Sequence, residues 1–295
     1  MSTLDGAPLM DRKKAIKKIE RYQRMAARFV KKATTAGERW IDTSCDKVRV
    51  LEYGFDSQEK KPLFVDIHGG GWALMFPELD EGINHCLLEK TKVKIISIDY
   101  PKAPQNPFPI GIEATYEVIK HYYDNAEEYG IDRDNIGIGG YSSGGNFATV
   151  ACIMANERKD IRFKYQILCY PGTDAAEDPY NKPKCKKGLT NKMIEAIVLS
   201  YFTDPEDAKS PYASPVYATN EQLTGLPPVL MISAGDGDPL TPEGHRYRKK
   251  LEDAGVRVEL HEFKGVLHGF MQEESLAAEE AIGLMIDFIN SQQGH

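Results

Sequence analysis

Residues 135–148 constrain the fold of this chain more than any other stretch. A short apolar segment leads into Gly-Tyr-Ser-Ser-Gly at 140–144, and a helical pattern of apolar residues follows. Glycines on both sides of a serine permit a strand-to-helix turn so sharp that larger side chains would collide. Such a turn lifts one hydroxyl clear of the backbone, at the positive end of the helix dipole. Ser142 has glycines at the required spacing and Ser143 does not, so Ser142 is the candidate nucleophile.

Apolar periodicity predicts strands and helices that alternate along the chain. Strands are predicted at 48–53, 62–67, 93–98, 135–139, 163–169, 228–233 and 256–263. Helices are predicted at about 79–92, 111–128, 146–157 and 276–290. Another helix should start at Thr241, with the threonine as N-cap and Pro242 in the first position. This alternation predicts an α/β fold, with a mostly parallel central sheet and helices on both faces.

Residues 173–210 interrupt the alternation with prolines, a lysine cluster and one helical stretch at 191–202. An excursion this long between sheet strands usually forms a lid or a binding element. We expect its apolar side to cover a pocket together with the N-terminal helix; that side contains Met193, Ile194, Ile197 and Tyr201. The predicted division is therefore N-terminal cap helices at 1–40 and a core at 41–295 that carries a cap insertion at about 173–212.

The N-terminal helix, predicted within residues 11–32, has an apolar stripe and a basic face. Residues 12–32 carry ten basic residues and one acid, a balance of +9 that leaves −16 elsewhere, since the net charge is −7. The helix could anchor to a membrane surface, or it could pack on an acidic body with its basic face in water. We favour packing and expect no stable membrane association. An acidic chain is also a poor nucleic-acid binder, so no nucleic-acid partner is expected.

Composition restricts the remaining classes. No apolar run in the 295 residues approaches the roughly 18 that a membrane span needs. The first residues lack the basic-then-apolar order of a signal peptide. Five cysteines, odd in number and never arranged C-x-x-C, argue against a disulfide framework and a zinc site. We therefore expect a cytoplasmic protein with reduced cysteines and without a metal or organic cofactor.

A run of three glycines at 69–71 follows the strand predicted at 62–67, between His68 and Trp72. Successive glycines cost backbone entropy and contribute no side-chain packing. Without Cβ atoms, however, their peptide N–H groups can converge on an anionic oxygen. The loop therefore predicts a site that stabilises an oxyanion.

A serine hydroxyl needs a neighbouring base to become nucleophilic, and that base needs a carboxylate to orient it. In folds that carry such an elbow, the acid and then the histidine follow the serine along the chain, on loops after late strands. Asp236 and Asp238 follow the strand at 228–233, and His268 follows the strand at 256–263. The residues themselves therefore predict a triad of Ser142, His268 and one of these two aspartates.

With these motifs the chain resembles the hormone-sensitive-lipase-like family of α/β-hydrolase carboxylesterases, over roughly residues 48–290. The spacings also resemble the family's, with 96 residues from the serine to the second aspartate and 30 from there to the histidine. The shared motifs are HGGGW at 68–72, DYPKAP at 99–104, PFP at 107–109, GYSSGG at 140–145, ASP at 213–215, LPPV at 226–229, DPL at 238–240 and HGF at 268–270.

The resemblance implies an α/β-hydrolase fold with a helical cap and assigns further roles. It places the catalytic acid on the Asp of D-P-L, Asp238, in preference to Asp236. It places the oxyanion hole on the N–H groups of Gly70, Gly71 and Ser143.

Two residues are expected to shape the substrate pocket, Trp72 and Tyr141. Tyr141 departs from the Asp of the commonest family members. That change removes a charge beside the nucleophile and adds an aromatic wall, so we expect it to affect substrate preference and not the reaction.

The implied function is hydrolysis of small esters with short to medium acyl chains, through an acyl-enzyme. The same fold leaves open amide or peptide hydrolysis and the deacetylation of a sugar or natural product. A silent small-molecule binder, similar to the plant gibberellin receptor, would lack the histidine that is present here as His268. Family members are often dimers, so a homodimer is a further expectation.

Overall fold

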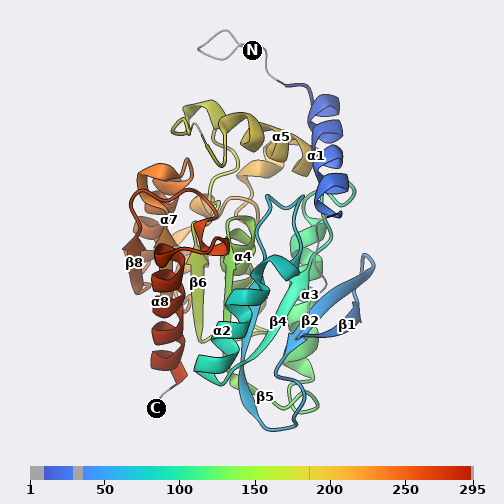
Figure 1. The fold of residues 1–295 in the computed structure, drawn as a ribbon, viewed down its shortest axis with the longest axis vertical. Helices are drawn as coiled ribbons and strands as arrows, with labels where there is room; N and C mark the ends of the chain where they lie inside the picture. Colours follow the sequence, from blue (N-terminus) through green and yellow to red (C-terminus); the bar gives the residue numbers. More distant parts are fainter. Residues whose placement is uncertain (1–9, 29–35, 186, 294–295) are drawn as a thin grey trace.

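The computed structural model describes residues 10–28, 36–185 and 187–293. Within them, one eight-stranded sheet has the order β1-β2-β4-β3-β5-β6-β7-β8 (Figure 1). β2 is antiparallel to β1 and β4, and every other neighbouring pair is parallel. The predicted α/β fold with a mostly parallel sheet is therefore confirmed. The strands are β1 (Gly37–Asp42), β2 (Lys47–Tyr53), β3 (Lys61–Ile67), β4 (Lys94–Asp99), β5 (Ile131–Tyr141), β6 (Tyr165–Cys169), β7 (Val229–Ser233) and β8 (Val258–Glu262).

Helices cover both faces of the sheet, because the central strands are apolar on both sides. In β3, Val65 belongs to the core beneath α3, α4 and α7, while its neighbour Phe64 belongs to the core beneath α2 and α8. Successive strand residues point to opposite faces, so one strand supplies both layers. The helices are α1 (Arg12–Ala26), α2 (Glu81–Thr91), α3 (Ile110–Asp124), α4 (Ser143–Arg158), α5 (Asn191–Tyr201), α6 (Asn220–Leu223), α7 (Thr241–Asp253) and α8 (Leu276–Gln293).

Two local predictions need correction. The edge strand β1 was not predicted, because only Ile41 in it is buried and an apolar alternation is absent. Its residues 37–40 therefore belong to the sheet and not to the N-terminal cap helices predicted at 1–40, of which 1–9 and 29–35 lie outside the described residues. Thr241 is the first residue of α7 and not its N-cap, which is Leu240. The Thr241 hydroxyl instead donates to the carbonyl of Gly235 at 2.6 Å.

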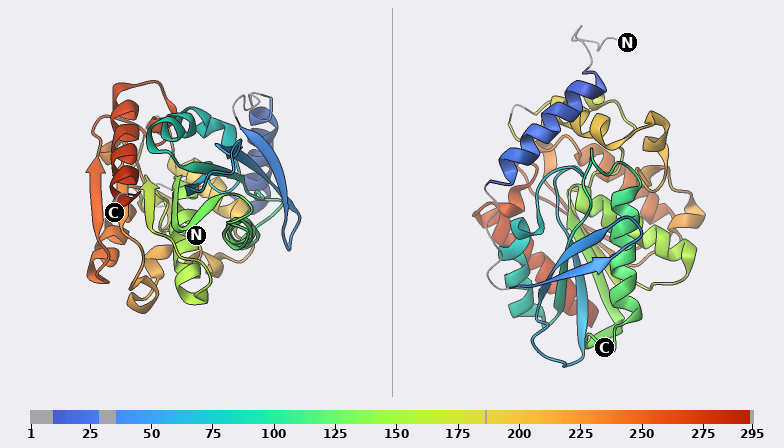
Figure 2. Two further views of the ribbon diagram at one scale, coloured as in Figure 1. Left: turned by 90° about the horizontal axis from the view of Figure 1, so that it is seen from below. Right: turned by 90° about the vertical axis from the view of Figure 1, so that its right-hand side faces the viewer.

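We use the name cap for α1 together with the described part of residues 173–212, which lie above the sheet in Figure 1. Figures 1 and 2 show α1 alongside α5, and the two helices are in contact. Asp11 caps α1 by accepting from the N–H of Lys14, and Ala15 and Ile19 are buried. The apolar stripe of α1 is therefore partly buried in the protein, at Ile19, whereas Met25 near the end of the helix is 44% exposed. No helix in the described part of the chain is long and apolar enough to cross a membrane.

A buried ion pair joins the cap to the core. Lys182, in the cap, contacts the Glu243 carboxylate of α7, and each side chain is 2% exposed. The Lys182 ammonium also donates to the carbonyl of Asp174 at 3.0 Å and to Glu177 at 3.1 Å. Glu243 accepts the N–H groups of Thr173 and Asp174 at 2.6 and 3.1 Å. Burial raises the pKa of Glu243 to about 7, and Lys182 opposes that rise. The start of the cap insertion therefore depends on this carboxylate.

Replacing Lys182 with methionine should destabilise the protein by about 3–5 kcal/mol, because a buried carboxylate then loses its partner. Urea denaturation at neutral pH measures the difference in free energy of unfolding. The matched control is Lys187→Met, which removes an exposed ammonium from the same segment and should change stability by less than about 0.5 kcal/mol. Equal effects of the two variants would contradict the proposed anchoring.

Candidate active site

Ser142 lies at the turn between β5 and α4, with φ 54° and ψ −115°. A positive φ is rare for a residue with a side chain and indicates a strained turn. The backbone around it is held by three hydrogen bonds. The Ser142 N–H donates to Cys169 at 2.9 Å, and its carbonyl accepts from Asn146 at 3.0 Å and Gly172 at 3.2 Å. These bonds keep the hydroxyl at the carboxyl edge of the sheet.

The two glycines of the elbow are required by a close approach of β3. A Cβ on Gly144 would lie 1.9 Å from the carbonyl oxygen of Ile67, and one on Gly140 would lie 2.5 Å from the same oxygen. Real Cβ atoms essentially never come within 3.0 Å of such an atom. The motif recognised in the sequence is therefore a steric requirement, because β3 and the first turn of α4 touch here.

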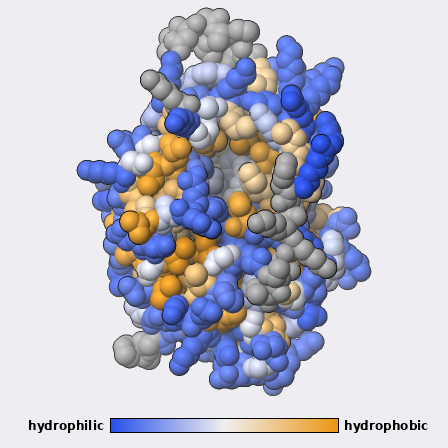
Figure 3. Space-filling model, viewed as in Figure 1, coloured by the Kyte–Doolittle hydropathy of each residue, from blue (hydrophilic) through white to orange (hydrophobic). Residues whose placement is uncertain are grey.

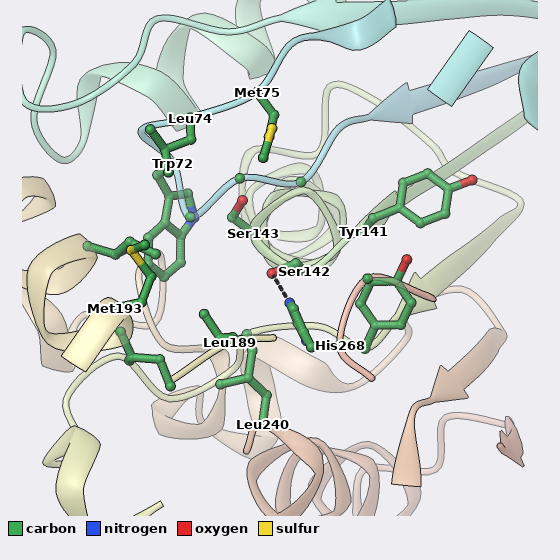
Figure 4. Close-up of a pocket in the computed structure, with 18 of the residues that line it drawn as sticks. Trp72, Leu74, Met75, Tyr141, Ser142, Ser143, Leu189, Met193, Leu240 and His268 are labelled. Atoms are coloured by element: carbon green, nitrogen blue, oxygen red, sulfur yellow. Dashed lines mark hydrogen bonds between the residues drawn. The ribbon is translucent and has the colours of Figure 1, made fainter. Parts of the chain in front are cut away.

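Two hydrogen bonds connect Ser142 to His268 and His268 to Asp238. The Ser142 hydroxyl lies 2.8 Å from His268 Nε2 (Figure 4). Nδ1 of the same ring lies 2.8 Å from Asp238 Oδ2. The other oxygen of Asp238 accepts the N–H of Leu240 at 2.9 Å. Asp238 is 1% exposed, whereas Asp236 lies on the surface. The tertiary structure thus brings the three predicted residues together and leaves the alternative aspartate in solvent.

The glycine loop after β3 runs beside this serine. Gly70 and Gly71 have φ 121° and 62°, values that favour glycine. Within residues 10–28, 36–185 and 187–293, their N–H groups donate to no acceptor. Ser143 is the first residue of α4, so its N–H has no partner within the helix either. The three predicted donors therefore remain available to an anionic oxygen.

His68 supports the loop from below. Its ring is fully buried, stacks on Tyr100 with centroids 4.3 Å apart, and has Nδ1 2.6 Å from the carbonyl of Gly69. Burial lowers the pKa of His68 to about 3, so the ring is neutral at physiological pH. Its neutral Nδ1–H donates to Gly69. The sequence located His68 in the motif but did not reveal this supporting contact.

A cavity of about 360 Å³ opens above Ser142, between the core and the cap. Figure 3, which has the same view as Figure 1, shows a hollow in the surface with apolar residues around it. Trp72 lines the cavity and stacks on Tyr201 of α5, with centroids 4.6 Å apart. The aliphatic side chains that line it are Leu74, Met75, Leu79, Ala175, Leu189, Met193, Ile194, Ile197, Val198 and Leu240. In the described chain, no group of three or more His, Cys, Asp or Glu side chains is arranged to hold a metal ion.

Comparison with known proteins now adds to this geometry. The family model for the alpha/beta hydrolase fold matches residues 64–272. The chain is 32% identical to the carboxylic ester hydrolase LipN of Mycobacterium tuberculosis, over 75% of this chain and 60% of that protein. It is 31% identical to an arylesterase of Saccharolobus solfataricus, over 71% and 68%. A solved hyperthermophilic esterase from the archaeon Pyrobaculum calidifontis matches with a TM-score of 0.81 at 30% identity, over 96% of this chain and 94% of that one.

The chain belongs to the hormone-sensitive-lipase-like family of α/β-hydrolase carboxylesterases. The resemblance inferred from its motifs is thereby confirmed. The sheet order and the helices on both faces are those of an α/β-hydrolase.

Tyr141 borders the cavity of this carboxylesterase, but its ring points away from Ser142 (Figure 4). The side chain is 2% exposed, and its hydroxyl lies 4.0 Å from the sulfur of Met285 in α8. Tyr141 therefore fills the core beneath the elbow instead of forming an aromatic wall. Sequence alone could not distinguish these directions, because both begin from the same backbone position.

Two residues of the site in this carboxylesterase were not predicted. Tyr170 follows β6 and Gln272 follows the His268 loop, and both line the cavity. Neither belongs to a spacing rule for nucleophile, base or acid. Their position beside His268 became visible only once the loops were placed in space.

The first prediction for the site concerns Gly71. A Cβ there would lie 2.6 Å from the Ile197 side chain of α5, and alanine at this φ costs a further 1 kcal/mol or so. Gly71→Ala should therefore displace a donor and lower kcat for ester hydrolysis at least about tenfold.

Adding Ile197→Ala should restore part of the lost kcat, because it removes the clash but not the backbone strain. Ile197→Ala alone is the control. Steady-state kinetics on a short ester measures all three variants, and a wild-type kcat in Gly71→Ala would contradict the assignment.

The second prediction concerns acid stability. His68 is neutral when folded down to about pH 3, whereas an unfolded histidine binds a proton below about 6.5. The unfolded state therefore binds more protons in this range, and stability falls as pH decreases. Relative to His68→Gln, the wild type should lose about 1.4 kcal/mol per pH unit between about pH 6 and 5. Urea denaturation of both proteins at several pH values measures this difference, and other titrating groups cancel. A pH-independent difference would count against a neutral His68.

Proposed function

We propose that this carboxylesterase hydrolyses small esters with short to medium acyl chains through Ser142, His268 and Asp238. The observation that carries the proposal is the pair of 2.8 Å hydrogen bonds that join the serine to the histidine and the histidine to the buried aspartate. Nucleophilic attack needs a base within hydrogen-bond distance of the serine hydroxyl and a carboxylate that orients this base. The three side chains have that arrangement.

The acylation step uses this arrangement directly. His268 Nε2 accepts the hydroxyl proton of Ser142 while Ser142 Oγ forms a bond to the ester carbonyl carbon. Asp238 accepts the Nδ1–H, which fixes the tautomer and stabilises the imidazolium. Negative charge develops on the carbonyl oxygen, where the N–H groups of Gly70, Gly71 and Ser143 are available as donors. The C–O bond to the alcohol then breaks, and the alcohol leaves with the proton from His268.

Deacylation repeats the sequence with water. His268 removes a proton from water, the resulting hydroxide adds to the acyl carbon, and the same N–H groups stabilise the second oxyanion. The bond to Ser142 Oγ breaks, the serine recovers its proton from His268, and the carboxylic acid departs. No step requires another protein nucleophile.

The cavity supports apolar substrates. Its lining is mostly aliphatic and aromatic, and the buried Lys182 and Glu243 that border it are bonded to each other and to the backbone. An acetylated sugar would need unoccupied polar groups to bind its hydroxyls. We therefore prefer small esters to sugar deacetylation. The division into a cap and an α/β core, with the cap closing this pocket, is part of the same proposal.

A matched pair of aspartate variants tests the triad. Asp238→Asn should lower kcat for p-nitrophenyl butyrate by at least about 10³-fold, because His268 loses its orienting carboxylate. Asp236→Asn removes an exposed carboxylate two residues away and should stay within about twofold of the wild type. Ser142→Ala should lose at least about 10⁴-fold. Near-wild-type rates in Asp238→Asn or Ser142→Ala would contradict the mechanism.

An ester series with acyl chains of about two to twelve carbons tests the substrate class. We expect kcat/KM to be highest for short to medium chains and to fall for the longest, because the cavity is closed on the cap side. Anilides and acetylated sugars serve as the comparison. A higher kcat/KM for either of these would favour an amidase or a deacetylase on the same fold.

A further inference from the structure

Gln272 connects the core to the aromatic ring that packs on His268. It lies in the turn Phe270–Gln272, directly after the His268 loop. Its Nε2 donates to Asp80 at 2.8 Å, and its Oε1 accepts from the Tyr170 hydroxyl at 2.8 Å. The amide is therefore bonded at both ends, through its NH₂ group to Asp80 and through its oxygen to Tyr170.

Tyr170 is the link between this amide and the catalytic imidazole. Its ring meets the His268 ring at 67° with centroids 5.1 Å apart, an edge-to-face arrangement. Its backbone has φ 37°, and its N–H donates a hydrogen bond of 2.6 Å to the carbonyl of Ile232 in β7. The main chain is thus held by the sheet, and the hydroxyl by Gln272. The ring between these two ties has little freedom to move away from His268.

The far end of the connection is Asp80, which is fully buried at the end of the turn before α2. Its second oxygen has no hydrogen-bond partner among the described residues. Burial and the nearby carboxyl of Asp66 raise the pKa of Asp80 well above its ordinary range. An un-ionised carboxyl still accepts the Gln272 amide through its carbonyl oxygen. The anchor therefore does not require a buried negative charge.

The loop that carries His268 needs such support. Lys264, Gly265 and Leu267 are exposed, and the loop contains two glycines with positive φ. Asp238 holds the imidazole at Nδ1, along one edge of the ring. Its other bond, from Nε2 to Ser142, also lies near the plane of the ring, so the packing contact with Tyr170 restrains the ring from a different direction.

We propose that Gln272 is a positioning residue for the reaction: it holds Tyr170 against His268 and ties the end of the His268 loop to Asp80. The inference rests on the proposed function, in which His268 is the base. Small displacements of a catalytic group can cost up to about 100-fold in rate. The contribution should therefore appear in kcat and not in substrate affinity.

The test uses Gln272→Leu, Tyr170→Phe and the double variant on one short ester. Each single variant should lower kcat about tenfold while KM changes less than about threefold. The double variant should be no slower than the slower single variant, because both changes interrupt one chain of contacts. A merely structural role would lower the thermal midpoint without this kcat pattern.

Conservative variants supply the controls. Tyr165→Phe removes the hydroxyl of another buried tyrosine, in the same core and without a partner among the described residues, and should retain wild-type kcat. Asp80→Asn keeps an oxygen that accepts from Gln272 and should stay within about threefold. Asp80→Leu removes it and should resemble Gln272→Leu. If Gln272→Leu does not fold, Tyr170→Phe and the Asp80 pair still decide the question.

The outcomes separate this inference from the triad itself. Wild-type kcat in folded Gln272→Leu or Tyr170→Phe, or losses that multiply in the double variant, would overturn the positioning role. Failure of the triad would appear differently, as near-wild-type hydrolysis in Asp238→Asn. With the triad intact, all Gln272 and Tyr170 variants should still react with a fluorophosphonate at Ser142, only more slowly.

Discussion

The contact between the end of β3 and the first turn of α4 is the constraint on which the site depends. The Ile67 carbonyl occupies the space where a side chain at Gly144 or Gly140 would lie. This approach places the serine turn directly beside the glycine loop that continues from β3. Ser142 and the N–H groups of Gly70 and Gly71 are neighbours for this steric reason, although about seventy residues separate them along the chain. Rigid strands provide the placement that flexible loops would lack.

The packing of the cap also depends on a glycine, because Gly71 has no side chain to keep α5 away from the loop. Ile197 lies where a Cβ of Gly71 would be, so α5 can close directly over the loop. Trp72 extends the contact by stacking on Tyr201, and Lys182 joins the cap to α7 through Glu243. The pocket wall and the glycine loop at 69–71 are therefore parts of one packed unit. Substitutions in the cap should therefore change the position of the reacting atoms as well as the size of substrate that the pocket accepts.

Much of the fold could be predicted because its signals are local. The buried strands are continuous apolar runs, and the serine elbow is specified within five residues. The edge strand β1 was not predicted because its side chains are mostly exposed, so its sequence lacks the alternation of apolar and polar residues that a half-buried strand shows. Four lysines cluster in the cap insertion, and the packing was needed to show that Lys182 contacts Glu243. Thr241 was predicted as an N-cap because capping rules consider only the helix N–H groups, whereas its hydroxyl donates to the carbonyl of Gly235.

By itself, the sequence determined the fold class and selected Ser142 and His268 as the candidate nucleophile and base, because chain order and glycine spacing are properties of the chain. From the residues alone the acid stayed open between two aspartates, and the family resemblance favoured Asp238. Tertiary structure decided which of them is buried beside the histidine, and it turned the Tyr141 ring into the core. It also brought Gln272 to Asp80, 192 residues away. Such contacts depend on how distant loops pack together, and no local pattern of residues encodes that separation.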